Sequence, residues 1–320
     1  MSRSEEWYRS VRGELRRIVE EDGPWTAHRF DLGGGLETMS EAPGSTDWFV
    51  HMTRSYLRCA VLALGRPASR LRVLDIGCLE GGMSIELARA GCEVVGLDVR
   101  EQHIRKARFV AEVLGVPNVS FVVGDMLKLA EHDLGTFDVV LCAGTLYHVD
   151  APDQLAFLVS LNERCRGIAL FDLHVSTAAE EAYEARDGLT VLGHSYLEHT
   201  TSDPAERRRS GWASLHNTHS FWPTERSLAN LLLEAGFALV SRPLAPVVEY
   251  PWQERAYWFA HSASHAVRLG IPATPGSPLA DPDRRPLRSP HTRSLVGTPA
   301  ANPATVPLAA ADGVPVASPL

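Results

Sequence analysis

The chain has 320 residues, of which 45% are hydrophobic and 22% are charged, and this composition suits a sizeable core in one or two domains. The net charge of −8 argues against a broad basic surface for nucleic acid or an anionic membrane. The sequence contains no signal peptide and no apolar stretch of about 18 residues, so no membrane partner is expected. Five cysteines without a C-x-x-C pair predict small buried apolar side chains in a reduced, cytoplasmic protein.

Residues 1–64 are expected to form an N-terminal helical cap. Apolar residues recur at helical spacing over 5–21, and a second helix is expected over Thr46–Leu64, with Asp47 near its start. Between them, three consecutive glycines at 33–35 predict a tight or mobile turn. Two roles stay open for the segment between the helices, a cover over an active site or a packing arm without a catalytic part.

Residues 71–88 hold a strand, a glycine-rich turn and a helix in succession. The apolar run over 71–76 predicts a buried strand of a parallel sheet, with Asp75 near its carboxyl end. Three glycines follow in the turn: Gly77, Gly81 and Gly82. Glycines there allow backbone to approach a ligand closely, and the start of the next helix offers free N–H groups.

A second acid follows at a distance that is typical of nucleoside sites. Glu93–Leu97 predicts the neighbouring strand, and Asp98 ends it. An acid about 20 residues after a glycine turn can accept hydrogen bonds from both ribose hydroxyls. Taken alone this fits NAD as well as other nucleosides, but Leu79 and Gly82 break the G-x-G-x-x-G spacing of NAD-binding turns.

Two further strands decide between these ligands. Phe121–Asp125 ends a strand with a Gly-Asp pair, and 137–142 predicts another strand that leads to Thr145-Leu146-Tyr147-His148. Together with the two motifs above, these residues resemble the class I S-adenosylmethionine (SAM)-dependent methyltransferases over roughly residues 70–260. The resemblance implies an α/β fold, a Rossmann-like seven-stranded and mostly parallel sheet with helices on both faces. The family commonly has glycine where Leu79 stands.

The resemblance also implies SAM as the cofactor and a place for each part of it. Asp75 and the Gly77–Gly81 turn would lie near the methionine part, Asp98 would bind the ribose, and Asp125 with Met126 would flank the adenine. The expected cofactor-binding residues are Asp75, Gly77, Cys78, Gly81, Asp98, Val99, Asp125, Met126 and Ala143.

The chain alternates strand and helix, which predicts a parallel sheet with right-handed crossovers and ligands at the carboxyl ends of its strands. The fifth strand is expected near 167–173. A helix with Pro223 in its first turn and two antiparallel edge strands, Phe237–Val240 and Ala256–Ala260, are expected to complete the fold. The other predicted elements are strands near 71–76, 93–97, 119–123 and 137–142, and helices near 82–90, 100–114 and 152–164.

The expected SAM-dependent methyltransferase domain covers 65–265. Its insert over 174–220 follows strand five and is too long for a simple loop, so it is predicted to cover the pocket or form its wall. Residues 266–320 are predicted to be a disordered tail rich in proline and alanine, because eleven of the 21 prolines lie in 271–320 without an apolar period.

Histidine suits a base role near neutral pH, and two histidines follow predicted strands. The expected catalytic residues are His148, Tyr147 and His174. The expected substrate-binding residues lie in the insert: His194, Tyr196, Trp212 and His216. Asp150, Asp172 and His174 could contribute to a metal site, but no dense spacing of ligands supports one, so no metal is predicted.

The function expected from these features is transfer of a methyl group from SAM to a small-molecule acceptor, in specialised metabolism. The Leu-Tyr-His triplet and the long insert also resemble tRNA wobble-uridine carboxymethyltransferases, so a tRNA-modifying enzyme that uses SAM or carboxy-SAM is one alternative. The acidic balance, with a basic cluster only at Arg207–Arg209, argues against tRNA. A SAM-binding regulator, or an enzyme that cleaves or cyclises SAM, is the other alternative. The sequence does not predict the oligomeric state.

Overall fold

The computed structural model describes residues 3–39, 46–201, 203–243 and 255–269. All of them belong to the first of two compact units, Met1–Pro282. The second unit, Asp283–Leu320, lies outside the described residues, as does nearly all of the predicted tail. The predicted domain boundaries therefore stay predictions.

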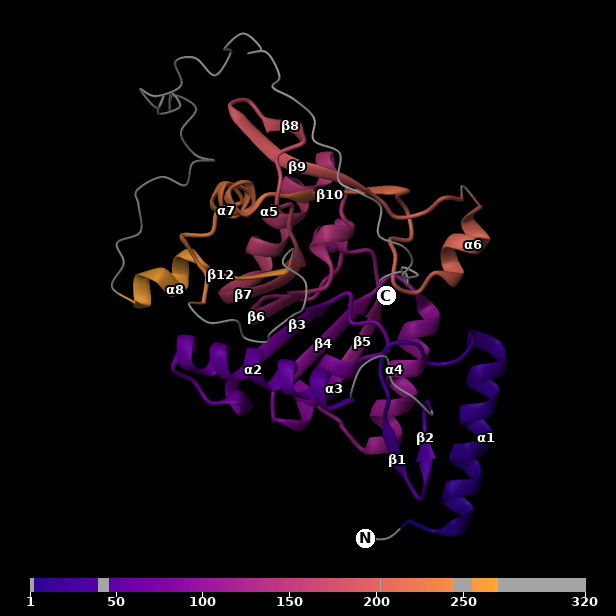
Figure 1. The fold of residues 1–320 in the computed structure, drawn as a ribbon. Coiled ribbons are helices and arrows are strands. Elements are labelled where there is room, and N and C mark those ends of the chain that lie inside the picture. The colour runs from indigo at the N-terminus through magenta and orange to yellow at the C-terminus, as the bar shows by residue number, and fades with distance from the viewer. Residues whose placement is uncertain (1–2, 40–45, 202, 244–254, 270–320) are drawn as a thin grey trace, which may run out of the picture. The chain divides into compact units, whose positions relative to one another are not determined.

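A seven-stranded sheet forms the centre of the first unit (Figure 1), as predicted. Its strand order is β11-β12-β7-β6-β3-β4-β5, in which β12 runs antiparallel to both of its neighbours and the other pairs are parallel. The strands are β3 (Arg72–Ile76), β4 (Glu93–Asp98), β5 (Val119–Val123), β6 (Phe137–Ala143), β7 (Cys165–His174), β11 (Leu239–Ser241) and β12 (Arg255–His261).

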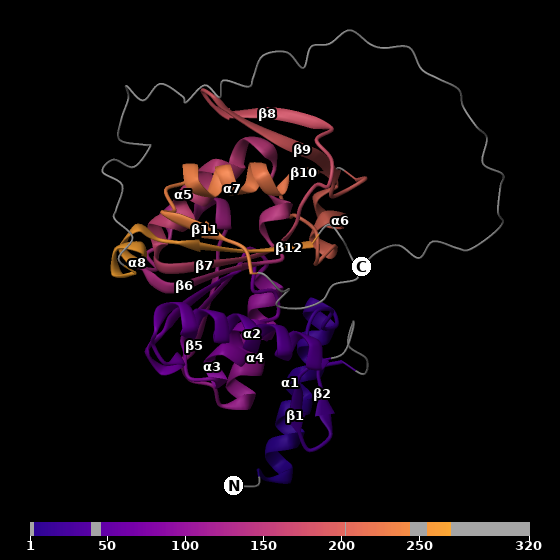
Figure 2. The ribbon, with the colours of Figure 1, turned by 60° about the vertical axis from the view of Figure 1, so that its left-hand side comes forward.

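Helices cover both faces of this sheet (Figures 1 and 2). One face carries α2 (Thr46–Leu64), α3 (Gly82–Arg89) and α4 (Glu101–Leu114), and the other carries α5 (Gln154–Arg164) and α7 (Glu225–Glu234). Consecutive residues of a strand point to opposite faces, so Val73 packs with the α2 side and Leu74 with the α5 side. Four of the five cysteines are buried, as expected: Cys78, Cys92, Cys142 and Cys165.

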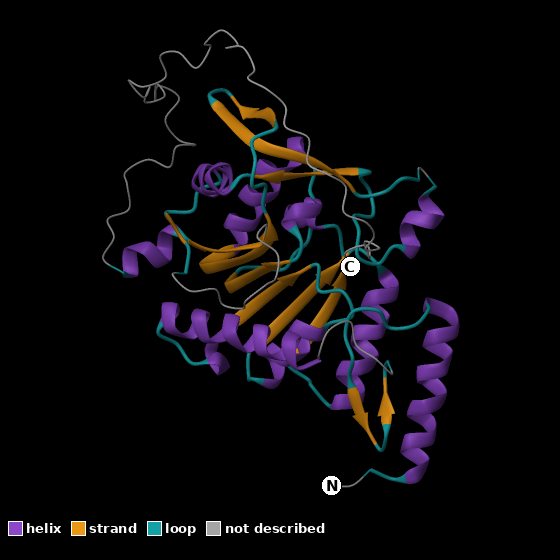
Figure 3. Ribbon diagram, viewed as in Figure 1, coloured by secondary structure: helices purple, strands orange, loops and turns teal. Residues whose placement is uncertain are grey.

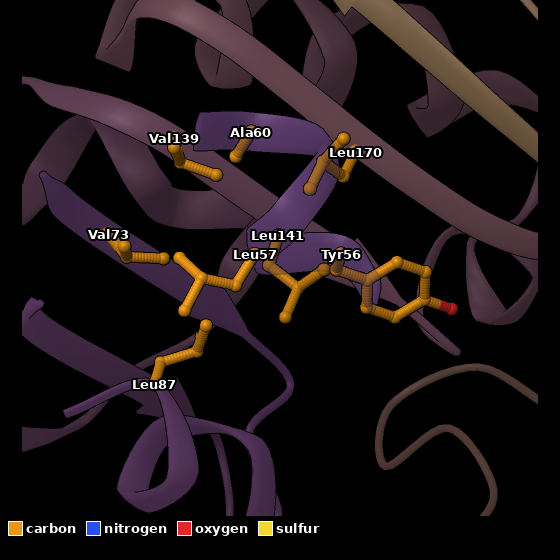
Figure 4. A pocket seen from close by; sticks show the side chains of 8 residues that line it. All are labelled: Tyr56, Leu57, Ala60, Val73, Leu87, Val139, Leu141 and Leu170. Atoms are coloured by element: carbon orange, nitrogen blue, oxygen red, sulfur yellow. The ribbon is translucent and has the colours of Figure 1, made fainter. Parts of the chain in front are cut away.

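The contact between α2 and the sheet leaves one small hollow, which Figure 4 shows. Its volume is about 10 Å³, and its lining is entirely apolar, since the Tyr56 hydroxyl points away from it: Tyr56, Leu57, Ala60, Val73, Leu87, Val139, Leu141 and Leu170. A buried water needs a hollow of about 10–15 Å³ and polar partners within it, so this apolar hollow is a packing gap and no ligand site.

The N-terminal part contains the predicted helix α1 (Glu5–Asp22) and a hairpin of β1 (Asp31–Gly33) and β2 (Leu36–Glu37). The three glycines make the hairpin turn, each with a positive φ. Residues 40–45 lie outside the described part. None of the helices in the described ranges is long and apolar enough to cross a membrane.

The insert after β7 forms a second sheet (Figure 3). Its order is β10-β9-β8, all antiparallel, with β8 (Glu181–Arg186), β9 (Leu189–Leu197) and β10 (His219–Pro223), and α6 (Pro204–Arg209) lies between β9 and β10. One prediction was wrong: Pro223 does not lie in the first turn of α7 but ends β10. The N-cap of α7 is Thr224, whose hydroxyl accepts from Ser227 N.

Candidate functional site

The predicted site residues gather at the carboxyl ends of five adjacent strands. Asp75, Asp98, Ala143 and His174 lie at or next to the ends of β3, β4, β6 and β7, and Asp125 follows β5 by two residues. These strands are neighbours in the order β7-β6-β3-β4-β5 and run parallel. Their ends therefore meet at one edge of the sheet, where ligands bind in such folds.

The turn between β3 and α3 has a left-handed backbone at three residues. Gly77, Leu79 and Gly81 have φ values of 69°, 49° and 84°. Leu79 thus takes the conformation that a glycine would take, at a cost of roughly 1–2 kcal/mol. Its amide donates to Asp98 Oδ2 at 3.0 Å, which helps to hold the strained residue. A Cβ on Gly77 would meet Thr145 Oγ1 at 2.8 Å, so β3 and β6 approach closely here.

Asp98 is buried and partly satisfied by protein groups. Its Oδ1 accepts from Arg100 N at 2.8 Å and faces His103 Nδ1 at 3.3 Å, and its Oδ2 accepts from the Leu79 amide. A carboxylate has about four lone-pair positions, so three contacts leave capacity on Oδ2. A buried acid with spare acceptor capacity fits a ligand hydroxyl.

Asp75 is buried beneath the same turn. Its Oδ2 accepts from Ser84 Oγ at 2.5 Å, which ties β3 to the first turn of α3. Burial raises the pKa of Asp75 to about 6, and the nearby Asp98 adds to this, while the Ser84 hydrogen bond opposes it. Asp75 therefore braces the turn from below.

Beside β5, Asp125 caps the short helix over Met126–Glu131 by accepting from Leu127 N at 2.9 Å. Its Oδ2 lies 3.8 Å from His216 Nε2 of the insert. The structure thus places His216, a predicted substrate-binding residue, next to a predicted cofactor-binding one. Arg100 joins the same parts, since its Nη2 donates to Ser210 O and Ala213 O at 2.8 Å. The insert therefore reaches across the β4 and β5 ends.

Aromatic rings crowd the β6 and β7 ends. Trp222 of β10 stacks on His174 and on Tyr196, with 4.7 Å between ring centroids in each pair. Tyr147 meets the His174 ring edge-on at 4.8 Å, and His194 lies 5.2 Å from Trp222. We call these five residues the aromatic cluster. It joins four predicted site residues, the catalytic Tyr147 and His174 and the substrate-binding His194 and Tyr196, through Trp222, which the sequence indicated only as a helix start.

Asp172 is a buried carboxylate close to the aromatic cluster. Asp172 accepts from Tyr56 Oη of α2 and from Arg255 Nε of β12, both at 2.6 Å. The Arg255 guanidinium lies 5.2 Å from the Tyr147 ring centroid. Burial raises the pKa of the Tyr147 hydroxyl, and the Arg255 charge opposes that rise. Among the described residues, no group of three or more His, Cys, Asp or Glu is arranged to hold a metal ion.

His148 pairs with a carboxylate that the sequence did not indicate. Its Nδ1 lies 2.8 Å from Glu198 Oε1, and Glu198 Oε2 accepts from Ser214 N at 3.1 Å. Burial alone would raise the pKa of Glu198, but the hydrogen bond and charge of His148 hold it below its usual value. The ionised carboxylate only accepts, so Nδ1–H is the donor, and the lone pair that the ring exposes when it gives up its other proton lies on Nε2.

His174 differs from His148 in its surroundings. Its Nδ1 is buried and has no hydrogen-bond partner among the described residues. Burial, with the positive charge of Arg255, lowers the pKa of His174 to about 4. His174 is therefore neutral near pH 7 and lacks the oriented partner that His148 has. The two predicted histidines are neighbours of the same Tyr147 ring but are not chemically equivalent.

One predicted residue lies apart from the candidate site, and one hollow elsewhere competes with it. Trp212 lies in the loop after α6 and is 43% exposed, away from the contacts of the aromatic cluster described above. A wider hollow of about 330 Å³ lies between α1, the β1–β2 hairpin and α4 and not at the strand ends. The strand ends, with their polar and titratable groups, outweigh this hollow as the candidate site.

The groups at the strand ends fit SAM. Asp98 has acceptor capacity for a ribose hydroxyl, the left-handed turn brings backbone close to the β3 end, and Asp125 lies one strand further along. Sequence comparison agrees with this assignment of the cofactor. The model of a methyltransferase domain matches residues 67–234.

Relatives and solved structures give the same picture. Magnesium-protoporphyrin O-methyltransferase of Rhodobacter capsulatus is 34% identical over 168 residues, 52% of this chain and 72% of that protein. Ubiquinone biosynthesis O-methyltransferase of Albidiferax ferrireducens is 30% identical over 128 residues, 39% of this chain but only 46% of that protein. The N-terminal domain of EvdMO1, crystallised in the presence of SAH and D-fucose, is 27% identical with a TM-score of 0.60, and the match covers 78% of this chain and 96% of that chain. Because the family match spans more than half of the sequence, the chain belongs to the methyltransferase domain family and is a SAM-dependent methyltransferase.

Proposed function

We propose that the protein transfers a methyl group to a hydroxyl oxygen of a small molecule that binds between the β6 and β7 ends and the insert. The His148–Glu198 pair is the observation that carries this proposal. Weakly acidic hydroxyl groups need a base during attack, and a neutral imidazole held by a carboxylate supplies one. The two relatives named above are both O-methyltransferases, which supports oxygen as the acceptor atom.

Bound SAM supplies a methyl group on a sulfonium, and its displacement leaves S-adenosylhomocysteine. In the proposed reaction His148 Nε2 takes the proton of the acceptor hydroxyl while the oxygen forms its bond to the methyl carbon. Glu198 keeps Nδ1–H in place and stabilises the imidazolium that results. Water then takes the proton from His148. The role of the protein is to hold acceptor and base in line with the methyl group.

The aromatic cluster is proposed to hold the acceptor. Trp222 stacks on both His174 and Tyr196, and Tyr196 itself is 42% exposed, so the free face of the Tyr196 ring is the surface proposed for the ligand. Such a face suits a planar ring or the apolar face of a sugar. The neutral state of His174 avoids an unpaired charge beside that ligand.

The test is to incubate the purified protein with SAM and a metabolite extract, and to follow nucleoside products and mass gains by mass spectrometry. S-adenosylhomocysteine together with a metabolite that gains one methylene mass supports the proposal. The chemical shift of the new methyl carbon in an NMR spectrum of the product then distinguishes an O-methyl from an N-methyl group. Methylthioadenosine would indicate cleavage or cyclisation of SAM instead, and a modified nucleoside in RNA would indicate the tRNA alternative.

A further inference from the structure

The segment Pro24–His28, which we call the N-terminal arm, packs on the turn that is proposed to bind the cofactor. Trp25, Ala27 and His28 are buried, with exposed fractions of 2%, 2% and 6%. Trp25 lies 6.1 Å from the Phe109 ring of α4 and 5.4 Å from Lys106 Nζ. Although the arm precedes the sheet in sequence by more than one helix, it is anchored to the β3–α3–α4 region.

The anchor is Glu80, the residue between Leu79 and Gly81 in the turn. It is 0% exposed, and its carboxylate accepts from three consecutive amides of the arm: Thr26 N at 2.8 Å, Ala27 N at 2.9 Å and His28 N at 3.1 Å. The fourth group is Lys106 Nζ of α4, at 3.4 Å from Oε1, which also donates to Pro24 O at 2.6 Å. A buried charge is thus matched by one cation and three amides that have no strand partner.

The arm ends with its histidine ring against the start of α3. His28 Nδ1 accepts from Gly82 N at 3.3 Å, and a Cβ on Gly82 would meet His28 Cδ2 at 2.3 Å. Burial lowers the pKa of His28 to about 4, so the ring is neutral and its Nδ1 can accept. Only glycine at position 82 leaves room for this ring. On its other side, the ring meets Phe49 of α2 at 5.0 Å.

The arm also lies beside the insert. A Cβ on Gly211 would lie 3.7 Å from Thr26 Oγ1 and 3.3 Å from His103 Nε2. His103 in turn faces Asp98, the proposed ribose ligand. The arm and the insert therefore both lie beside His103, which links them to the carboxylate at the end of β4.

We infer that Glu80 is a positioning residue that holds the N-terminal arm on the glycine-rich turn, so that His28 forms part of the wall of the SAM site. This inference rests on the proposed location of that site. It favours the cover over the packing arm among the two roles that the sequence left open. Glu80 itself acts through the arm, because all its described contacts are to arm residues and to Lys106.

The test compares Glu80→Gln with Glu86→Gln, a matched variant on α3 whose carboxylate pairs with Arg54 at the surface. Glutamine has nearly the same shape, but one of its two terminal atoms is an N–H₂ donor. Depending on the orientation of the amide, this donor faces either the Ala27 and His28 amides or Thr26 N and Lys106, all of which are donors themselves. Hydrogen–deuterium exchange of residues 24–38 reports the arm, and calorimetry with S-adenosylhomocysteine reports the site. In Glu80→Gln we expect faster exchange and a dissociation constant at least about tenfold higher, a change of about 1.4 kcal/mol. Glu86→Gln should change neither.

Two results would overturn the inference: faster exchange of the arm with unchanged affinity, or unchanged exchange in Glu80→Gln. If Glu80→Gln does not fold, His28→Ala replaces it, because this change keeps the amide bonds to Glu80. His28→Ala should weaken the binding of S-adenosylhomocysteine while the arm stays protected from hydrogen exchange. An unchanged affinity for S-adenosylhomocysteine would again contradict the inference. Asp98→Ala in the same assay separates the two proposals. Normal binding in Asp98→Ala rejects the cofactor site itself, whereas weak binding there with normal binding in the Glu80 and His28 variants rejects only the role of the arm.

Discussion

His148 Nδ1 and Glu198 Oε1 lie 2.8 Å apart although 50 residues separate them in the sequence. His148 follows β6 of the main sheet, and Glu198 follows β9 of the insert. The insert therefore completes the chemical environment of a residue of the core fold. Removal of the insert would leave His148 without its carboxylate partner.

The first prediction concerns this pair. His148→Ala should lower kcat by about 10²–10⁴-fold, the usual contribution of a general base, with an unchanged dissociation constant for SAM. Glu198→Gln should give a smaller loss of kcat, because the amide oxygen still accepts from Nδ1 but its charge is gone. Steady-state kinetics with calorimetry measure both.

Glu181→Gln is the matched control for Glu198→Gln. Glu181 also lies in the insert, is exposed and bonds Ser195, so its loss should leave kcat unchanged. Full activity of His148→Ala would remove His148 from the reaction, and equal losses in the two glutamate variants would indicate a general effect on the insert.

The second prediction concerns Asp98. Asp98→Ala should weaken SAM binding by about 1.5–3 kcal/mol, the range for a hydrogen bond to a charged group. It also removes the acceptor that holds the left-handed Leu79, so the turn should become less ordered. Calorimetry measures the affinity. Glu93→Gln, at the first residue of the same strand and largely exposed, should bind SAM normally. Equal affinity of Asp98→Ala and the parent protein would contradict the assignment.

The third prediction concerns the proposed acceptor surface. Tyr196→Ala should raise the KM for the acceptor by several-fold, because a stacked aromatic pair contributes about 0.5–1.5 kcal/mol beyond its buried area. The dissociation constant for SAM should stay the same. Leu197→Ala changes the next residue of β9, which points to the opposite face and is 50% exposed, and should leave KM unchanged. A rise in the SAM dissociation constant, with KM for the acceptor unaltered, would place Tyr196 elsewhere.

Much of the fold follows from local sequence pattern. The apolar runs that predict five parallel strands fall within one or two residues of β3 to β7, because buried parallel strands need continuous apolar residues. Pro223 was wrongly predicted in the first turn of a helix because proline suits a helix start, and only its pairing with Gly193 distinguishes a strand. Asp75, Asp98 and Asp125 could be picked out as candidates because each lies within two residues of the carboxyl end of its strand.

The contacts across the site could not be predicted in the same way. Glu198 and Glu80 look like ordinary surface acids in the sequence, and each becomes a buried partner through residues that lie 16 to 54 positions away. Leu79 departs from the glycine pattern, yet its backbone is left-handed because Asp98 accepts its amide. Such pairings depend on tertiary packing and leave no periodic signal.

The last prediction uses the buried His28. Its pKa in the folded protein, about 4, lies below the ordinary value of 6.5, so the unfolded chain binds the proton more tightly. The stability that depends on neutral His28 is therefore fully present above pH 6.5 and is lost as the pH falls toward 4. His28→Ala removes packing at pH 7, but it also removes this acid sensitivity. The difference in unfolding free energy between parent and variant should shrink by about 2 kcal/mol from pH 7 to pH 5, since each pH unit below 6.5 counts about 1.4 kcal/mol.

Urea unfolding at the two pH values measures this difference. Asp75 has the opposite effect on the pH dependence of stability. Its pKa is raised from 3.8 to about 6, so the folded protein loses stability as the pH rises between these two values. This effect is common to parent and variant, so it cancels in the comparison. Leu62→Ala, at an exposed and non-titrating position of α2, should give the same difference at both pH values. If the His28→Ala difference also stays constant, the ring of His28 is not held neutral by burial, and its contact with Gly82 is not maintained in solution.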